Sequence, residues 1–190
     1  MSKLRLEVNR EGKIKLSITL LLLLFSFIAS IISKNGIVAL AMCGASLGDI
    51  FLMAKRGCLT GKEEKTFIWG IISFAGSHLF YLTAMKEARF AEELAWPMLI
   101  LFIVMMIMEG VGIKHTVPIC VPYGIMLILN LINSIYFNKL AIIGIILFII
   151  SDGSIVFFEI KKANRRFIRD IVVWGTYIPA QICLITSFLL

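Results

Sequence analysis

The chain has 190 residues, 59% of them hydrophobic, and its 19 lysines and arginines against 12 acidic residues give a formal charge of +7. The apolar share is well above the roughly 45–50% of typical soluble domains, which excludes a soluble globular protein and leaves no stretch for a separate soluble domain. The basic residues lie in short segments between apolar runs, not on one face with interleaved aromatic side chains, so nucleic acid is not an expected partner.

Apolar runs recur along the chain from residue 16 to residue 190. Residues 1–15 form a basic tail that is expected to be cytoplasmic, and residues 16–190 form a single transmembrane domain. The first run, residues 16–33, is longer than the apolar core of a signal peptide and precedes no A-x-A-like cleavage site, so it predicts an uncleaved transmembrane helix. Six further runs are each long enough to cross a bilayer as a helix: residues 36–54, 66–85, 95–113, 117–136, 140–160 and 170–190. The predicted fold is an all-α, polytopic membrane helix bundle of seven transmembrane helices.

The positions of lysine and arginine predict the orientation of the bundle, because cytoplasmic segments carry an excess of these residues. With a cytoplasmic N-terminus, the basic residues of the tail and of the loops after the second, fourth and sixth spans all lie inside. Fusing the fourth and fifth spans would place the basic segment 161–169 on the opposite side from the tail. Seven spans therefore predict an outside C-terminus, with few basic residues outside: Lys34, Lys86, Arg89 and Lys139.

Two carboxyl groups stand well inside predicted spans. Asp49 lies in "GASLGDIFL" of the second span, and Asp152 lies in "LFIISDGSIVFF" of the sixth. An ionisable group within a bilayer costs about 2.5–3.5 kcal/mol on insertion scales and usually faces the bundle interior. Serine or asparagine would link helices by hydrogen bonds at lower cost, so a functional role is favoured over interhelical bonding alone for these two acids.

Four further polar side chains lie in spans near the same depth. His78 and Tyr81 share one face of the third span, and Tyr177 and Gln181 lie in the seventh. At a helical rise of about 1.5 Å per residue, both acids fall in the cytoplasmic half of the bilayer, with these four groups between them and the midplane. Four helices are therefore expected to converge on one polar pocket.

Other motifs for chemistry are missing from the sequence. The two histidines, His78 and His115, lie in different segments, so no metal site is expected, and no G-x-S-x-G, H-E-x-x-H or phosphate-binding loop occurs. The four cysteines include no C-x-x-C pair and indicate no disulfide framework.

Four motifs lie along the chain in order, in "ASLGDIFL", "FIWGIISFAGSHLFYLTA", "FIISDGSIVFF" and "TYIPAQICLI". Their order and spacing resemble those of the YhhN-like membrane proteins, a family that includes the lysoplasmalogenases, from about Lys13 to the C-terminus. Members commonly have eight spans, so the first is expected to be missing here. Ala45 replaces a serine that is frequent in the family, and Pro179 is expected to kink the last helix. The matching positions are Gly48-Asp49, Phe67-Gly70-Phe74-His78-Tyr81, Ser151-Asp152 and Tyr177-Ala180-Gln181.

The resemblance implies hydrolysis of the vinyl ether bond of a lysoplasmalogen to a fatty aldehyde and a glycerophosphoethanolamine or glycerophosphocholine. Such a bond is cleaved by protonating the terminal alkene carbon, after which water attacks the oxocarbenium ion. One protonated carboxyl and one carboxylate suit this chemistry, as in glycosidases, and no cofactor is required. Asp49 and Asp152 are the expected catalytic pair, with their individual roles open. The expected positioning residues for water or substrate are His78, Tyr81, Ser151, Tyr177 and Gln181, while Lys55, Arg56 and Arg169 either contact the phosphate or only set the topology.

Three alternatives remain open at this point. The acids could relay protons in a transporter, although no inverted repeat is visible. The polar cluster could hold together a structural or sensory bundle, or the chain could hydrolyse another lipid.

The expected partners are the lysophospholipid substrate and membrane lipids, and the sequence indicates no obligate protein partner. The expected location is a bacterial inner membrane.

Overall fold

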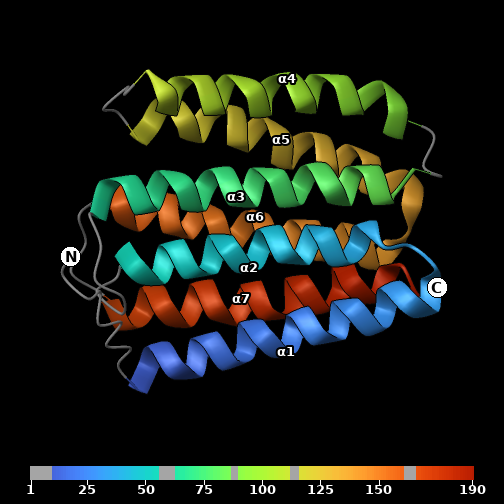
Figure 1. The fold of residues 1–190 in the computed structure, drawn as a ribbon, viewed down its shortest axis with the longest axis horizontal. Coiled ribbons are helices and arrows are strands. Elements are labelled where there is room, and N and C mark those ends of the chain that lie inside the picture. Colours follow the sequence, from blue (N-terminus) through green and yellow to red (C-terminus); the bar gives the residue numbers. More distant parts are fainter. Residues whose placement is uncertain (1–9, 56–62, 87–89, 112–115, 161–165) are drawn as a thin grey trace, which may run out of the picture.

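A computed structural model describes residues 10–55, 63–86, 90–111, 116–160 and 166–190 of the chain. These residues form seven α-helices and no strand, which confirms the predicted all-α bundle (Figure 1). The helices are α1 (Arg10–Ser33), α2 (Ile37–Lys55), α3 (Glu63–Ala84), α4 (Ala91–Gly110), α5 (Thr116–Phe137), α6 (Lys139–Ile160) and α7 (Arg166–Ser187).

Each predicted span coincides with one helix, but the ends differ. The first helix begins at Arg10, inside the segment assigned to the tail, because lysine and arginine are good helix formers. The last helix continues through Pro179. Six helices are long and apolar enough to cross a membrane, and the apolar part of α2 within the described residues, Ile37–Met53, is slightly shorter. These helices suggest a multi-pass membrane protein.

The helices are arranged as a closed ring. Helices that are consecutive in the sequence pack side by side, and α1 also contacts α7. Direct contact between α3 and α5 leaves α4 on the outside of the bundle (Figure 1). Because the number of described helices is odd, α1 begins at one end of the bundle and α7 ends at the other.

Two helix pairs, α2 with α3 and α6 with α7, form the most extensive contacts of the bundle. Glycine permits this approach in both pairs. A Cβ added at Gly44 would lie 3.1 Å from the backbone nitrogen of Ser77, and one added at Gly144 would lie 3.1 Å from that of Leu184. These two tightly packed pairs carry all of the residues expected to act in catalysis or in positioning water and substrate.

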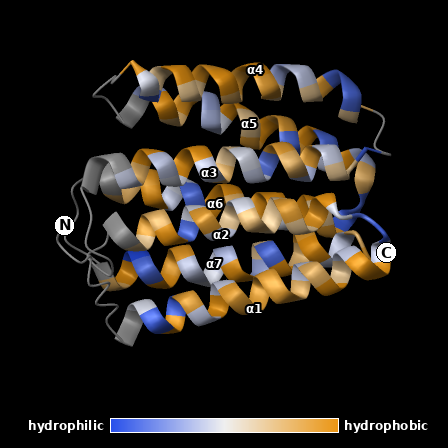
Figure 2. Cartoon of the chain, viewed as in Figure 1, coloured by the Kyte–Doolittle hydropathy of each residue, from blue (hydrophilic) through white to orange (hydrophobic). Residues whose placement is uncertain are grey.

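The bundle has an apolar exterior and places many polar side chains inside. Large hydrophobic side chains on α1 and elsewhere are exposed, whereas Ser77, Asn130 and Gln181 are fully buried. Figure 2 shows that much of α1 and of the other helices consists of hydrophobic residues. A protein surrounded by lipid can expose hydrophobic side chains without cost, whereas polar side chains are costly on its lipid-facing surface.

Candidate functional site

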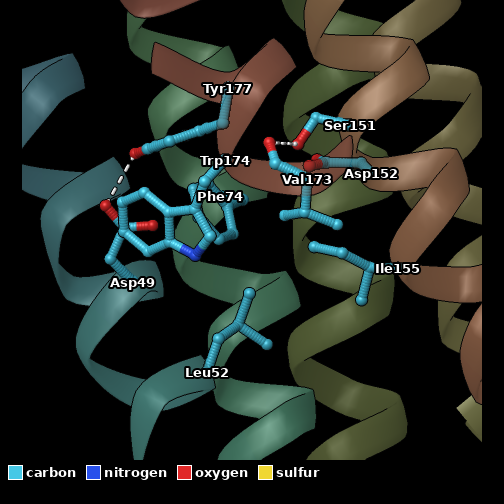
Figure 3. A pocket seen from close by; sticks show the side chains of 9 residues that line it. All are labelled: Asp49, Leu52, Phe74, Ser151, Asp152, Ile155, Val173, Trp174 and Tyr177. Carbon is cyan, nitrogen blue, oxygen red and sulfur yellow. Dashed lines mark hydrogen bonds between the residues drawn. The ribbon is translucent and has the colours of Figure 1, made fainter. Parts of the chain in front are cut away.

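Asp49 of α2 and Asp152 of α6 line the same cavity, although 103 positions separate them in the sequence (Figure 3). Both are buried, with 5% and 6% of their surface exposed. Ser151 and Tyr177 also line the cavity, together with the apolar or aromatic side chains Leu52, Phe74, Ile155, Val173 and Trp174. Its volume is about 10 Å³, on the order of what one water molecule needs.

Two hydroxyl groups from different helices hold the carboxyl group of Asp49. The hydroxyl of Tyr177 on α7 donates to Asp49 Oδ2 at 2.8 Å, a bond drawn in Figure 3, and that of Thr19 on α1 donates to the same oxygen at 2.9 Å. Three helices therefore meet at one carboxyl oxygen, which restricts the orientation of this side chain.

A third hydroxyl group holds the second acid. Tyr123 of α5 is buried and donates a hydrogen bond to Asp152 Oδ2. The neighbouring Ser151 hydroxyl donates to the backbone oxygen of Val173 on α7 at 3.2 Å, so it links α6 to α7 beside the cavity. Each acid thus receives a tyrosine hydroxyl from another helix.

Aromatic rings form one wall of the cavity. Tyr177 packs edge-on against Phe74 and Phe148, with ring centroids 6.0 Å and 5.5 Å apart, and against Trp174 at 5.6 Å. Phe148 also contacts His78, whose ring centroid lies 4.6 Å away. The wall fixes the position of the Tyr177 ring, and through it the hydroxyl that reaches Asp49.

His78, Tyr81 and Gln181 form a second polar group beyond this wall. The Tyr81 hydroxyl donates to Gln181 Oε1 at 2.8 Å, and the His78 ring lies 6.4 Å from that of Tyr81. Neither histidine nitrogen, nor Gln181 Nε2, has a hydrogen-bond partner within the described parts of the chain, although all three are buried. Buried groups of this kind usually bind water or ligand.

The expected single pocket is therefore two neighbouring groups. Asp49, Asp152, Ser151 and Tyr177 line the cavity, whereas His78, Tyr81 and Gln181 do not. Tyr123 connects the groups, because its hydroxyl bonds Asp152 and its ring lies 5.9 Å from that of His78. Depth along the helices, on which the expectation of one pocket rested, does not separate positions across the bundle.

The sequence analysis missed Thr19 and Tyr123. Threonine and tyrosine are common in membrane helices and carry no charge, so neither stands out in an apolar run as an aspartate does. The signal that could have found them is the need of each buried carboxyl for a hydroxyl donor from a neighbouring helix.

Of the basic residues considered for phosphate contact, the structure describes only one side chain. Arg169 Nε lies 3.3 Å from Asp170 Oδ1, and Lys15 Nζ lies 3.0 Å from Asp170 Oδ2. Arg56 and the side chain of Lys55 lie outside the described residues. Lys15, treated above as part of the tail, is buried between α1 and α7 with only 7% of its surface exposed.

The polar side chains of the cavity end in hydroxyl and carboxyl groups. In the described segments, no three histidine, cysteine, aspartate or glutamate side chains come together as metal ligands. The cysteines that lie within those segments, Cys43, Cys120 and Cys183, form no disulfide with one another. The arrangement is suited to proton transfer and to stabilising a cation, which are the two tasks that paired carboxyl groups perform in acid–base catalysis.

A comparison with family models matches residues 13–188 to the YhhN family. The matched segment contains both acids and the hydroxyl groups that bond them. Searches of curated proteins and of solved structures found no significant match.

Proposed function

Because the chain belongs to the YhhN family over nearly its whole length, and lysoplasmalogenases are members of that family, we propose that it hydrolyses the vinyl ether bond of lysoplasmalogens. One observation supports this activity most strongly. Asp49 and Asp152, from different helices, line one buried cavity that has room for about one water molecule. Protonation and hydration of a vinyl ether need an acid, a base and one water.

The reaction begins with proton transfer to carbon. One carboxylic acid gives its proton to the alkene carbon that is distal to the ether oxygen, and the electron pair of the double bond forms the new C–H bond. The resulting oxocarbenium ion carries its positive charge on the ether oxygen and the adjacent carbon. A carboxylate beside this cation stabilises it, in the way that paired carboxyls act in glycoside hydrolysis.

Water then completes the cleavage. The second carboxylate accepts a proton from a water molecule as the water oxygen bonds to the cationic carbon, which gives a hemiacetal. The second carboxyl, now protonated, gives its proton to the glycerol oxygen while the first carboxylate accepts the proton of the hemiacetal hydroxyl, and the bond between the carbon and the glycerol oxygen breaks to give an alcohol and a fatty aldehyde. Both carboxyl groups thereby return to their starting protonation states. The products are the aldehyde and a glycerophosphoethanolamine or glycerophosphocholine, and the net reaction consumes one water.

The hydroxyl groups around the acids act as positioning groups in this scheme. Thr19 and Tyr177 hold Asp49, and Tyr123 holds Asp152, so that neither carboxyl rotates away from the substrate. Ser151 lies beside the second acid in the cavity. In the second polar group, the buried unpartnered nitrogens of His78 and Gln181 would hold water or the glycerol oxygens of the substrate, with Tyr81 orienting Gln181.

The test is aldehyde release by the purified protein in detergent. The substrate is an alkenyl lysophosphatidylethanolamine, and the control lipid is its saturated ether, which lacks the double bond to be protonated. Asp49→Asn and Asp152→Asn are compared with Glu93→Gln, a matched loss of one charge at an exposed position of α4. We expect aldehyde from the vinyl ether alone, loss in both asparagine variants, and wild-type turnover in the glutamine variant.

The same experiment separates the proposal from its rivals. If both asparagine variants fold and keep full turnover, these two acids are not the catalytic pair. If folded wild-type protein releases no aldehyde from either the ethanolamine or the choline lipid, the chain has another activity. A proton-coupled carrier would then move a solute across sealed vesicles without changing it chemically.

A further inference from the structure

A groove between α1 and α7 borders the aspartate cavity. It is formed by Ile14, Lys15 and Ile18 on α1 and by Phe167, Asp170, Ile171 and Trp174 on α7, and its volume is about 610 Å³. Trp174 lines both the groove and the cavity. A single indole side chain therefore stands between a large lateral space and the two buried acids.

The two spaces differ in what they can hold. The cavity has the volume of about one water molecule, whereas a groove of this size lies in the range of small-molecule binding sites, roughly 300–1,000 Å³. The cavity is too small for a lipid, so a lipid that reacts at the acids must reach them through a larger neighbouring space. Helix α1 packs more extensively on α2 than on α7, so the seam between α1 and α7 is the easier one to open.

The groove combines apolar sides with a charged floor. Ile14, Phe167 and Ile171 are each more than half exposed on its rim. On its floor, Lys15 Nζ bonds Asp170 Oδ2 at 3.0 Å and lies 5.8 Å from the Trp174 ring. Figure 2 shows hydrophilic residues on α1 and α7 at this same end of the bundle. Because Arg169 Nε lies 3.3 Å from Asp170 Oδ1, two cations face this one carboxylate, and a phosphate-bearing head group with one hydrocarbon chain matches the pattern.

The indole N–H group of Trp174 is a second feature of the groove. Its Nε1 atom is buried and has no hydrogen-bond partner among the residues that the structure describes. Buried tryptophan N–H groups usually find a partner, and a phosphate or glycerol oxygen is a suitable one. The unpartnered donor belongs to the side chain that lines both spaces, so an oxygen of a ligand that passes from the groove to the cavity would meet it.

We propose that the groove between α1 and α7 is the lateral entrance and head-group site for a single-chain phospholipid. The phosphate binds Lys15, the hydrocarbon chain lies along the apolar rim, and Trp174 moves aside to admit the ether end to the cavity. This inference deepens the proposed function and rests on it for the identity of the lipid.

The spacing along α1 agrees with this placement. Thr19, which bonds Asp49, lies one turn after Lys15 on the same face, about 6 Å along the helix axis. In a lysoplasmalogen, the three-carbon glycerol unit separates the phosphate from the vinyl ether. A phosphate on Lys15 therefore leaves the ether within reach of Asp49.

Binding can be measured without turnover by using the saturated-ether lysophosphatidylethanolamine. Trp69→Phe and Trp96→Phe together leave Trp174 as the only one of the three tryptophans. In this background, in phosphatidylcholine nanodiscs, we expect the lipid to change the Trp174 fluorescence saturably. Lys15→Gln should raise the dissociation constant about tenfold, as expected for loss of one charge-assisted contact. Lys15→Arg should restore most of the affinity.

Two controls identify what the lysine recognises. Lys13→Gln removes the same charge from an exposed position of α1 outside the groove and should leave binding unchanged. A monoalkylglycerol, which has the same chain and no phosphate, should bind Lys15→Gln and the parent protein equally. The proposal is overturned if Lys15→Gln behaves like Lys13→Gln, or if it weakens both lipids to the same extent.

The result is separable from the hydrolase proposal because aldehyde release is assayed on the same preparations. Aldehyde release with no dependence of lipid binding on Lys15 would contradict the groove and leave the hydrolase intact. Binding that depends on Lys15, with no aldehyde release, would establish the lipid site and contradict the hydrolase.

Discussion

Replacing Tyr177 by phenylalanine removes one hydroxyl group and keeps the ring that packs against Phe74, Phe148 and Trp174. The lost hydroxyl donates to Asp49 Oδ2 at 2.8 Å, and only 3% of the tyrosine is exposed, so bulk water does not replace it directly. A hydrogen bond to a charged group contributes about 1.5–3 kcal/mol. If the bond is kept in the transition state, its loss lowers turnover roughly ten- to hundredfold.

The assay is the initial rate of aldehyde release at saturating lysoplasmalogen, together with the thermal midpoint of the detergent-solubilised protein. Tyr136→Phe is the matched control, because Tyr136 lies half-exposed on α5 away from the cavity. Thr19→Val tests the same oxygen from the other side, and the double variant should lose less than the product of the two single losses. Wild-type turnover in a folded Tyr177→Phe protein would refute the role given to this hydroxyl.

Three further predictions concern other parts of the site and the bundle. Tyr123→Phe should lower turnover by a similar factor, since it removes the hydroxyl that bonds Asp152; an unchanged initial rate would count against this pairing. His78→Leu should keep the thermal midpoint close to wild type, because the nitrogens of His78 have no hydrogen-bond partner within the described residues. The same variant should lower turnover at least about tenfold, and full turnover would remove His78 from the proposed site. Gly144→Ala should lower the free energy of unfolding by about 1–3 kcal/mol, because the added methyl group would press against Leu184. Gly153→Ala should leave it unchanged, because a Cβ added there meets nothing within 4 Å. Equal thermal midpoints for the two variants would contradict the packing of α6 on α7.

The helices were predictable because each apolar run, when folded as a helix, is about as long as the hydrocarbon core of a bilayer is thick. Their boundaries were less so: α1 begins at Arg10, since basic residues support a helix even where they lower its hydropathy. Gly44 and Gly144 show why packing was not foreseen. The sequence contains 14 glycines, and nothing in it distinguishes the two at which a neighbouring backbone approaches closely.

The two acids were the predictable part of the site, because a buried carboxyl is costly and therefore conspicuous. Their similar depth in the bilayer predicted a common pocket, although depth does not fix positions across the bundle. The separation of His78 from the cavity was not predicted, because it depends on Phe148 lying against both His78 and Tyr177. In the sequence, Lys15 is one of several basic residues that indicate a cytoplasmic N-terminus. Its ion pair with Asp170 was not predictable, because it depends on α7 lying beside α1.

The most direct test of the central claim is the position of the isotope when hydrolysis runs in heavy water and the aldehyde is trapped as it forms. Proton transfer from a carboxyl to the alkene carbon predicts one deuterium on the carbon next to the aldehyde group, and no such product from Asp49→Asn or Asp152→Asn. An aldehyde that carries no deuterium at this carbon would contradict the mechanism, because the vinyl ether would then have been cleaved without protonation of its double bond.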